Sequence, residues 1–127
     1  MRDPNLLAGW ISMLAGVLSG AAIGLFFHRE HWLGGYGSLP RRMVRLGHIS
    51  FFGIGFLNIL FALTVASAPL PAPHLTVASY GLLGANLAMP ATCFLTAWRA
   101  PMRHLFPVPV TAVAVAIASM LLGWGGR

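Results

Sequence analysis

Acidic residues and lysine are almost missing from this chain of 127 residues. It has two acids, Asp3 and Glu30, no lysine and eight arginines, and charged residues make up 8% of it. A soluble domain usually carries about 25% charged residues. With so little charge and 57% hydrophobic residues, the chain cannot cover its own surface with polar groups. A lipid bilayer is therefore its expected solvent.

The same scarcity excludes several kinds of chemistry. A serine–histidine–acid triad and a carboxylate proton relay both need acids that the long apolar segments do not contain. No phosphate-binding loop or dinucleotide fingerprint is present. The single cysteine, Cys93, excludes an intramolecular disulfide. Independent catalysis is therefore not expected.

Four long apolar segments are present, each near the roughly 20 residues that cross a bilayer. In lipid such segments are helical, because the backbone must satisfy its own hydrogen bonds. The sequence predicts an all-α, integral membrane four-helix transmembrane bundle, a single domain with antiparallel neighbours and short loops. The predicted spans cover residues of about 5–27, 44–66, 75–98 and 107–124.

The arginines predict an orientation. Six of the eight lie in the first and third links between spans, while the other side has only Arg2 and Arg127. The positive-inside rule then places both termini outside a bacterial-type inner (plasma) membrane. Anionic lipids are the expected partners of these arginines, rather than nucleic acid, together with other membrane subunits or further copies of the chain. The six are Arg29, Arg41, Arg42, Arg45, Arg99 and Arg103.

Histidines gather at the predicted cytoplasmic ends of the spans. His28 ends the first span, His48 lies just inside the second, and His104 precedes the fourth. Histidines at similar depth on different helices are what a bis-histidine b-type haem needs. The hypothesis is a haem b ligated by His48 and by either His28 or His104. The cations expected to hold its propionates are Arg41, Arg42 and Arg45.

Two alternatives for the histidines remain open. Each can be an interfacial residue that bonds a lipid phosphate or a loop carbonyl. The segment from His28 to His31 also contains Glu30, so it offers two imidazoles and a carboxylate to a zinc, copper or iron ion. His48 or His104 would add a further ligand to such a cluster.

Small and polar residues mark the helix faces that should touch protein. Asn58 and Asn86 fall near the middle of the second and third spans, where an amide needs a partner. They predict either an interhelical hydrogen bond or a polar binding site. A ladder of small residues in the first span allows close approach of another helix. The ladder is Ser12, Gly16, Gly20 and Gly24, and its expected complement on the third span is Gly81, Ala85 and Ala88.

These features predict a small integral membrane subunit or accessory protein of a respiratory-type electron-transfer complex. In size, in its four spans and in the histidine that begins the second span, the chain resembles small membrane proteins that accompany respiratory oxidases, a likeness of architecture. One alternative is a cofactor-free packing or assembly subunit. Another is a small-solute transporter or channel that uses the region of Asn58 and Asn86.

Overall fold

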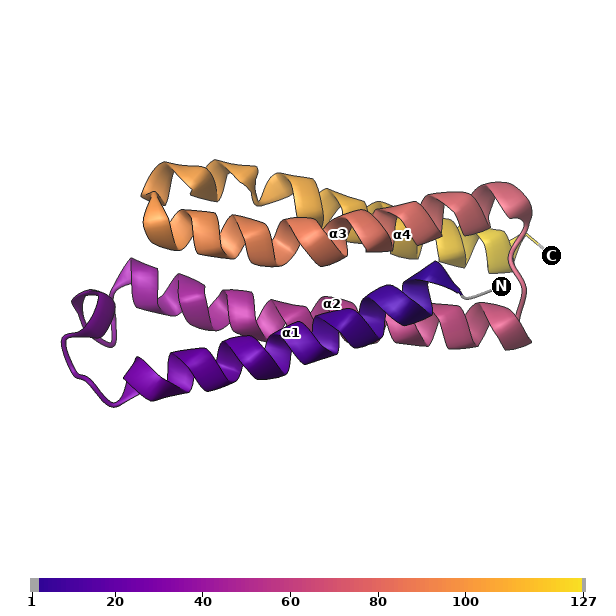
Figure 1. Cartoon of the computed structure of the whole chain (residues 1–127). Helices are drawn as coiled ribbons and strands as arrows, with labels where there is room; N and C mark the ends of the chain where they lie inside the picture. The colour runs from indigo at the N-terminus through magenta and orange to yellow at the C-terminus, as the bar shows by residue number, and fades with distance from the viewer. Residues whose placement is uncertain (1–2, 127) are drawn as a thin grey trace.

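The computed structural model describes residues 3–126, and this part of the chain is built from helices alone (Figure 1). The all-α prediction is confirmed. Consecutive long helices run antiparallel, and the two chain ends lie at the same end of the molecule (Figure 1). The elements are α1 (Pro4–Phe27), η1 (Trp32–Gly34), α2 (Leu39–Ser67), α3 (Ala72–Trp98), η2 (Ala100–Leu105) and α4 (Pro107–Gly125).

Three helical segments are long and apolar enough to cross a membrane: Pro4–Phe27, Leu39–Ser67 and Ala100–Gly125. The four predicted spans are therefore supported for three helices. α3 is 27 residues long and free of charged residues, but its polar side chains lower its mean hydropathy. Several of these side chains, such as Asn86 and Thr96, are buried between helices. The buried polar groups of α3 thus face protein and not the outer surface.

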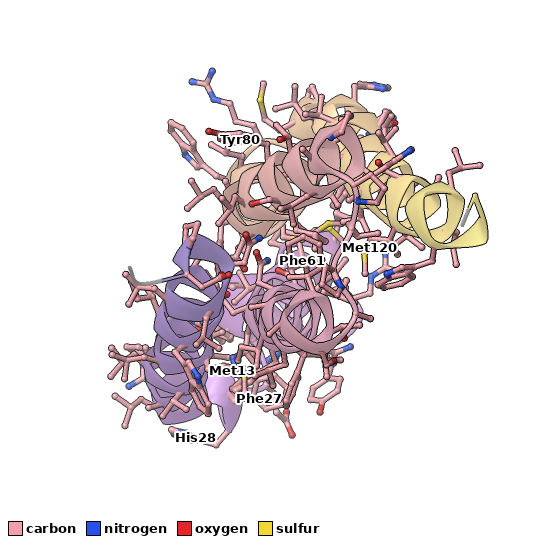
Figure 2. The ribbon with its side chains drawn as sticks, turned by 90° about the vertical axis from the view of Figure 1, so that its right-hand side faces the viewer. Met13, Phe27, His28, Phe61, Tyr80 and Met120 are labelled. Atoms are coloured by element: carbon pink, nitrogen blue, oxygen red, sulfur yellow. The ribbon has the colours of Figure 1, made fainter. Side chains whose placement is uncertain are left out.

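The helices form an open arrangement in which α2 and α3 make the centre. α1 packs mainly on α2, and α4 packs on α3. Figure 2 shows Phe61 of α2 near the middle, with α1 and α4 on opposite flanks. The flanking helices keep wide apolar outer faces, with Trp10 60% and Leu121 64% exposed. The hydrophobic core joins α2, α3, the α2–α3 link and α4 through Phe61, Leu70, Ala78, Leu82 and Ala116.

α2 begins at Leu39 and not at Val44 as predicted, so its first two turns carry arginines that the sequence had suggested for a loop. Ser38 caps the helix, because its hydroxyl accepts a hydrogen bond from the backbone N–H of Arg41 at 3.3 Å. Pro40 in the first turn suits a helix start, where its missing N–H costs nothing.

The glycine ladder of α1 packs against α2. An added Cβ at Gly9 would lie 2.8 Å from the carbonyl oxygen of Gly55, and one at Gly16 would meet the ring of Phe52. The expected complement on the third span is therefore wrong. Gly81 instead faces α4, where an added Cβ would lie 2.9 Å from the carbonyl oxygen of Ala112.

Candidate functional site

Arg41 closes the loop between α1 and α2 and is 1% exposed. Its Nη1 donates to the carbonyls of Arg29 and Glu30 at 3.1 and 3.2 Å, and its Nη2 donates to the carbonyl of Phe27. The guanidinium carbon also lies 4.5 and 4.6 Å from the ring centroids of Phe27 and Tyr36. The predicted role of Arg41 at a lipid or propionate surface is corrected, since both terminal nitrogens are committed to the end of α1.

A groove of about 670 Å³ opens between α1 and α2 near this loop. It brings together three predicted site residues, His28, Arg45 and His48, from two helices. The other three predicted haem-site residues, Arg41, Arg42 and His104, lie outside its lining. Arg42 is exposed on α2, and His104 is exposed on η2. The groove is lined by Gly20, Ile23, Gly24, Phe27, His28, Arg45, His48 and Ile49.

His48 is held in place by α1. Its Nδ1 lies 3.2 Å from Oγ of Ser19, and that hydroxyl donates to the carbonyl of Gly16 at 3.0 Å. When the hydroxyl proton of Ser19 goes to the carbonyl of Gly16, Ser19 accepts from the Nδ1–H of His48. In that tautomer the lone pair of the imidazole is on Nε2, the nitrogen that a metal would need.

Two glycines of α1 face the groove in different ways. The ring of His48 lies against Gly20, where any side chain would collide with it. One turn further, an added Cβ at Gly24 would meet nothing within 4 Å. His28, the cap at the end of α1, follows after another turn, so it shares a face with both glycines. The rise along α1 from Gly20 to His28 is roughly 12 Å. Because helical side chains lean back toward the N-terminus, the side chain of His28 is directed along the groove toward Gly24.

The two intramembrane asparagines bond to α1 and not to each other. Asn58 is fully buried, and its Oδ1 accepts from Nδ2 of Asn5 at 2.8 Å. Its own Nδ2 donates to backbone carbonyls of α2 and α3. Nδ2 of Asn86 donates to the carbonyl of Ala8 at 3.2 Å, while its Oδ1 is buried without a hydrogen-bond partner in the described chain. The predicted Asn58–Asn86 bond is therefore not formed.

The sequence does not predict the contacts of Asn5 and Ser19. Asn5 is the first residue of the first predicted span, and its amide bonds Asn58 and Ser79. Ser19 had no signal beyond its place before Gly20, because its contact depends on the rotation of α1 against α2.

The structure gathers no group of three or more histidine, cysteine or acidic side chains that could hold a metal ion within residues 3–126. The alternative of a metal cluster around Glu30 therefore finds no support there. His31 is exposed at the start of η1.

Comparison of the chain with protein-family models, with curated proteins and with solved structures gives no match.

Proposed function

We propose that the chain is a small integral membrane subunit or accessory protein of a respiratory-type electron-transfer complex, and that the groove between α1 and α2 holds a b-type haem. The observation that carries the proposal is the meeting of His28, Arg45 and His48 from two helices in one groove. Its volume of about 670 Å³ suits a large planar ligand.

Each residue has a defined task in this proposal. His48 would offer Nε2 to the iron, since Ser19 occupies Nδ1. His28, at the end of α1, would offer the second ligand, and Gly24 leaves open space between them along α1. Arg45 would neutralise an acidic group of the cofactor, and the bound iron would supply one-electron transfer.

The membrane setting of the proposal follows from the outer surfaces. α1 and α4 expose apolar side chains along their length, and the exposed arginines among residues 3–126 gather at the end of the molecule with the α1–α2 loop and η2. We propose that this end faces anionic lipids on the cytoplasmic side of a bacterial-type inner membrane, with both termini outside.

A second candidate is a cofactor-free packing or assembly subunit. The observation that favours it is the open arrangement of the helices. In an 18-residue apolar stretch of α1, only 17% of the residues are buried inside the chain. Such a face suits a neighbouring membrane subunit as well as lipid. The transporter alternative is less favoured, because every side-chain amide group of Asn58 is already bonded to protein.

The first experiment is a reduced-minus-oxidised absorption spectrum of the protein purified in mild detergent, with iron analysis of the same sample. A sharp b-type band with near-stoichiometric iron is expected. His48→Ala should lower the haem content at least about tenfold, because loss of an axial ligand removes several kcal/mol of binding free energy.

Gly24→Leu is a second test that leaves both histidines in place. Its side chain enters the open space of the groove, so haem content should fall while thermal stability stays near that of the wild type. His104→Ala is the matched control and should keep full haem content. If the wild-type protein is colourless and co-purifies with larger membrane subunits, the haem proposal fails. The function as a packing or assembly subunit then takes its place.

A further inference from the structure

The α1–α2 groove contains a cation without a counter-charge. Arg45 is half-buried in the groove lining, and its guanidinium carbon lies 5.4 Å from the ring centroid of Tyr36. Unlike Arg41, whose nitrogens donate to backbone carbonyls, Arg45 makes no side-chain hydrogen bond or ion pair within residues 3–126. The only acid near this end of the chain, Glu30, is exposed in the loop and does not line the groove. Arg45 is therefore free to pair with an anion from outside the chain.

His28 adds a second donor at the same end of the groove. It caps α1, whereas Arg45 lies on the facing wall formed by α2, about one turn closer to the loop than His48. An imidazole carries one N–H in either neutral tautomer and two when it is protonated. An anionic group at the loop end of the groove thus meets donors from both helices.

The rest of the groove is mostly apolar. An added Cβ at Gly24 would meet nothing within 4 Å, so open space lies along this face of α1. Ile49 on the opposite wall is 59% exposed, which means that the groove opens on the apolar outer surface. Apart from His48, the lining away from the two donors consists of Gly20, Ile23, Gly24, Phe27 and Ile49. Along the helix axis the groove therefore changes from cationic to apolar.

We propose that the α1–α2 groove of the haem-free protein holds one anionic phospholipid. Its phosphate pairs with Arg45 and His28, and one acyl chain lies in the apolar part beside Gly24. A free phosphate ion would leave most of the volume of about 670 Å³ unfilled. In its relation to haem this inference rests on the proposed function: both ligands use Arg45, so the lipid must leave before haem enters.

The test uses the full-length protein from haem-deficient cells, purified in mild detergent and stripped of lipid. Native mass spectrometry follows its titration with phosphatidylglycerol or with phosphatidylcholine of identical acyl chains. One phosphatidylglycerol per chain should bind about fivefold more tightly than phosphatidylcholine, because its headgroup has a net charge that a single arginine can pair. Equal binding of the two lipids would overturn the proposal.

Three variants separate the groove from a general layer of lipid around the arginines. Arg45→Gln should abolish the preference for phosphatidylglycerol. Arg42→Gln is the matched control, since it removes the same charge from an exposed position outside the lining, and it should keep the preference. Gly24→Leu should weaken both lipids alike, because its side chain fills the space of the acyl chain. Equal effects of Arg42→Gln and Arg45→Gln would contradict the groove site. If Arg45→Gln does not fold, the Gly24→Leu result decides the question.

Two competitors complete the test. Inorganic phosphate in large excess should not displace the lipid, and displacement would show that the groove binds the ion alone. Added haem should displace one phosphatidylglycerol per chain, whereas haem that binds beside the lipid would refute the shared site. If phosphatidylglycerol binds through Arg45 and haem does not bind at all, the haem proposal fails and the lipid site stands. If haem binds and no lipid preference exists, the lipid inference fails and the haem proposal stands.

Discussion

Arg41 and Arg42 are neighbours in sequence with opposite surroundings. The guanidinium of Arg41 is buried, bonded to the carbonyls of Phe27, Arg29 and Glu30 and placed over aromatic rings, whereas Arg42 is exposed. A buried cation is stable only where hydrogen bonds replace its water. Here backbone carbonyls of the last residue of α1 and of the loop that follows it provide that replacement.

Arg41→Gln should therefore lower the free energy of unfolding by about 3 kcal/mol, because hydrogen bonds to a charged group contribute more than neutral ones. Arg42→Gln is the matched control and should change it by no more than about 0.5 kcal/mol. Denaturant titration in mild detergent measures both. Equal effects of the two variants would contradict the role given to Arg41.

Two serine–histidine pairs join a flanking helix to a central one. Oγ of Ser19 on α1 lies 3.2 Å from Nδ1 of His48 on α2, and Oγ of Ser119 on α4 lies 3.2 Å from Nδ1 of His74 on α3. In each pair Nε2 is the ring nitrogen that remains for a ligand. The charge nearby differs, because Arg45 lines the groove beside His48, whereas the lining of the groove beside His74, between α3 and α4, includes no charged residue.

Among the elements, α1 changes its contact with α2 along its length. At Gly9 the two backbones touch, since an added Cβ would lie 2.8 Å from the carbonyl of Gly55 and 2.5 Å from Cγ1 of Ile59. At Gly24 an added Cβ would meet nothing. The helices are therefore tightly packed near the termini and apart near the loop, and the separation forms the α1–α2 groove.

Alanine substitutions should report this difference. Gly9→Ala should destabilise the protein by about 1–3 kcal/mol, because a backbone contact must open. Gly24→Ala should be neutral or stabilising by up to about 1 kcal/mol, since alanine is the better helix former. Thermal unfolding in detergent distinguishes them. Similar losses at both positions would mean that α1 and α2 are packed closely over their whole length.

For the whole molecule, the central question is whether α3 crosses the membrane with the other helices. Asn86, Thr92 and Thr96 of α3 are buried, whereas Thr76 and Tyr80 near its N-terminal end are exposed. If all four helices cross, both termini lie on one side, and the α1–α2 loop lies on the other with η2.

Single cysteines test this arrangement in a Cys93→Ala background. Gly37→Cys and Arg103→Cys should react with an impermeant thiol reagent from the cytoplasmic side of membrane vesicles, and Ser67→Cys from the opposite side. All three positions are exposed at the ends of helices or in loops. If Gly37→Cys and Arg103→Cys are labelled from opposite sides of the membrane, the chain between them crosses it an odd number of times. That result would contradict the crossing of both α2 and α3.

Much of the architecture could be predicted from the order of residues. The charge-poor apolar runs predicted helices, and Ser38 with Pro40 could have marked the true start of α2. The small residues of α1 correctly indicated a close helix contact. The partner of that contact was wrong, because glycine shows where a helix can be approached and not which helix approaches.

The sequence by itself predicted a helical chain with four apolar spans, of which the structure supports three as long and apolar enough to cross a membrane, and it placed His28, Arg45 and His48 near one end of their helices. Only the tertiary structure decided which side chains meet. It joined Asn58 to Asn5, buried Arg41 in the end of α1, and set Ser19 and Ser119 against histidines. The physical reason is that helix formation depends on local hydrogen bonding, whereas the rotation and separation of packed helices depend on contacts between residues far apart in the chain.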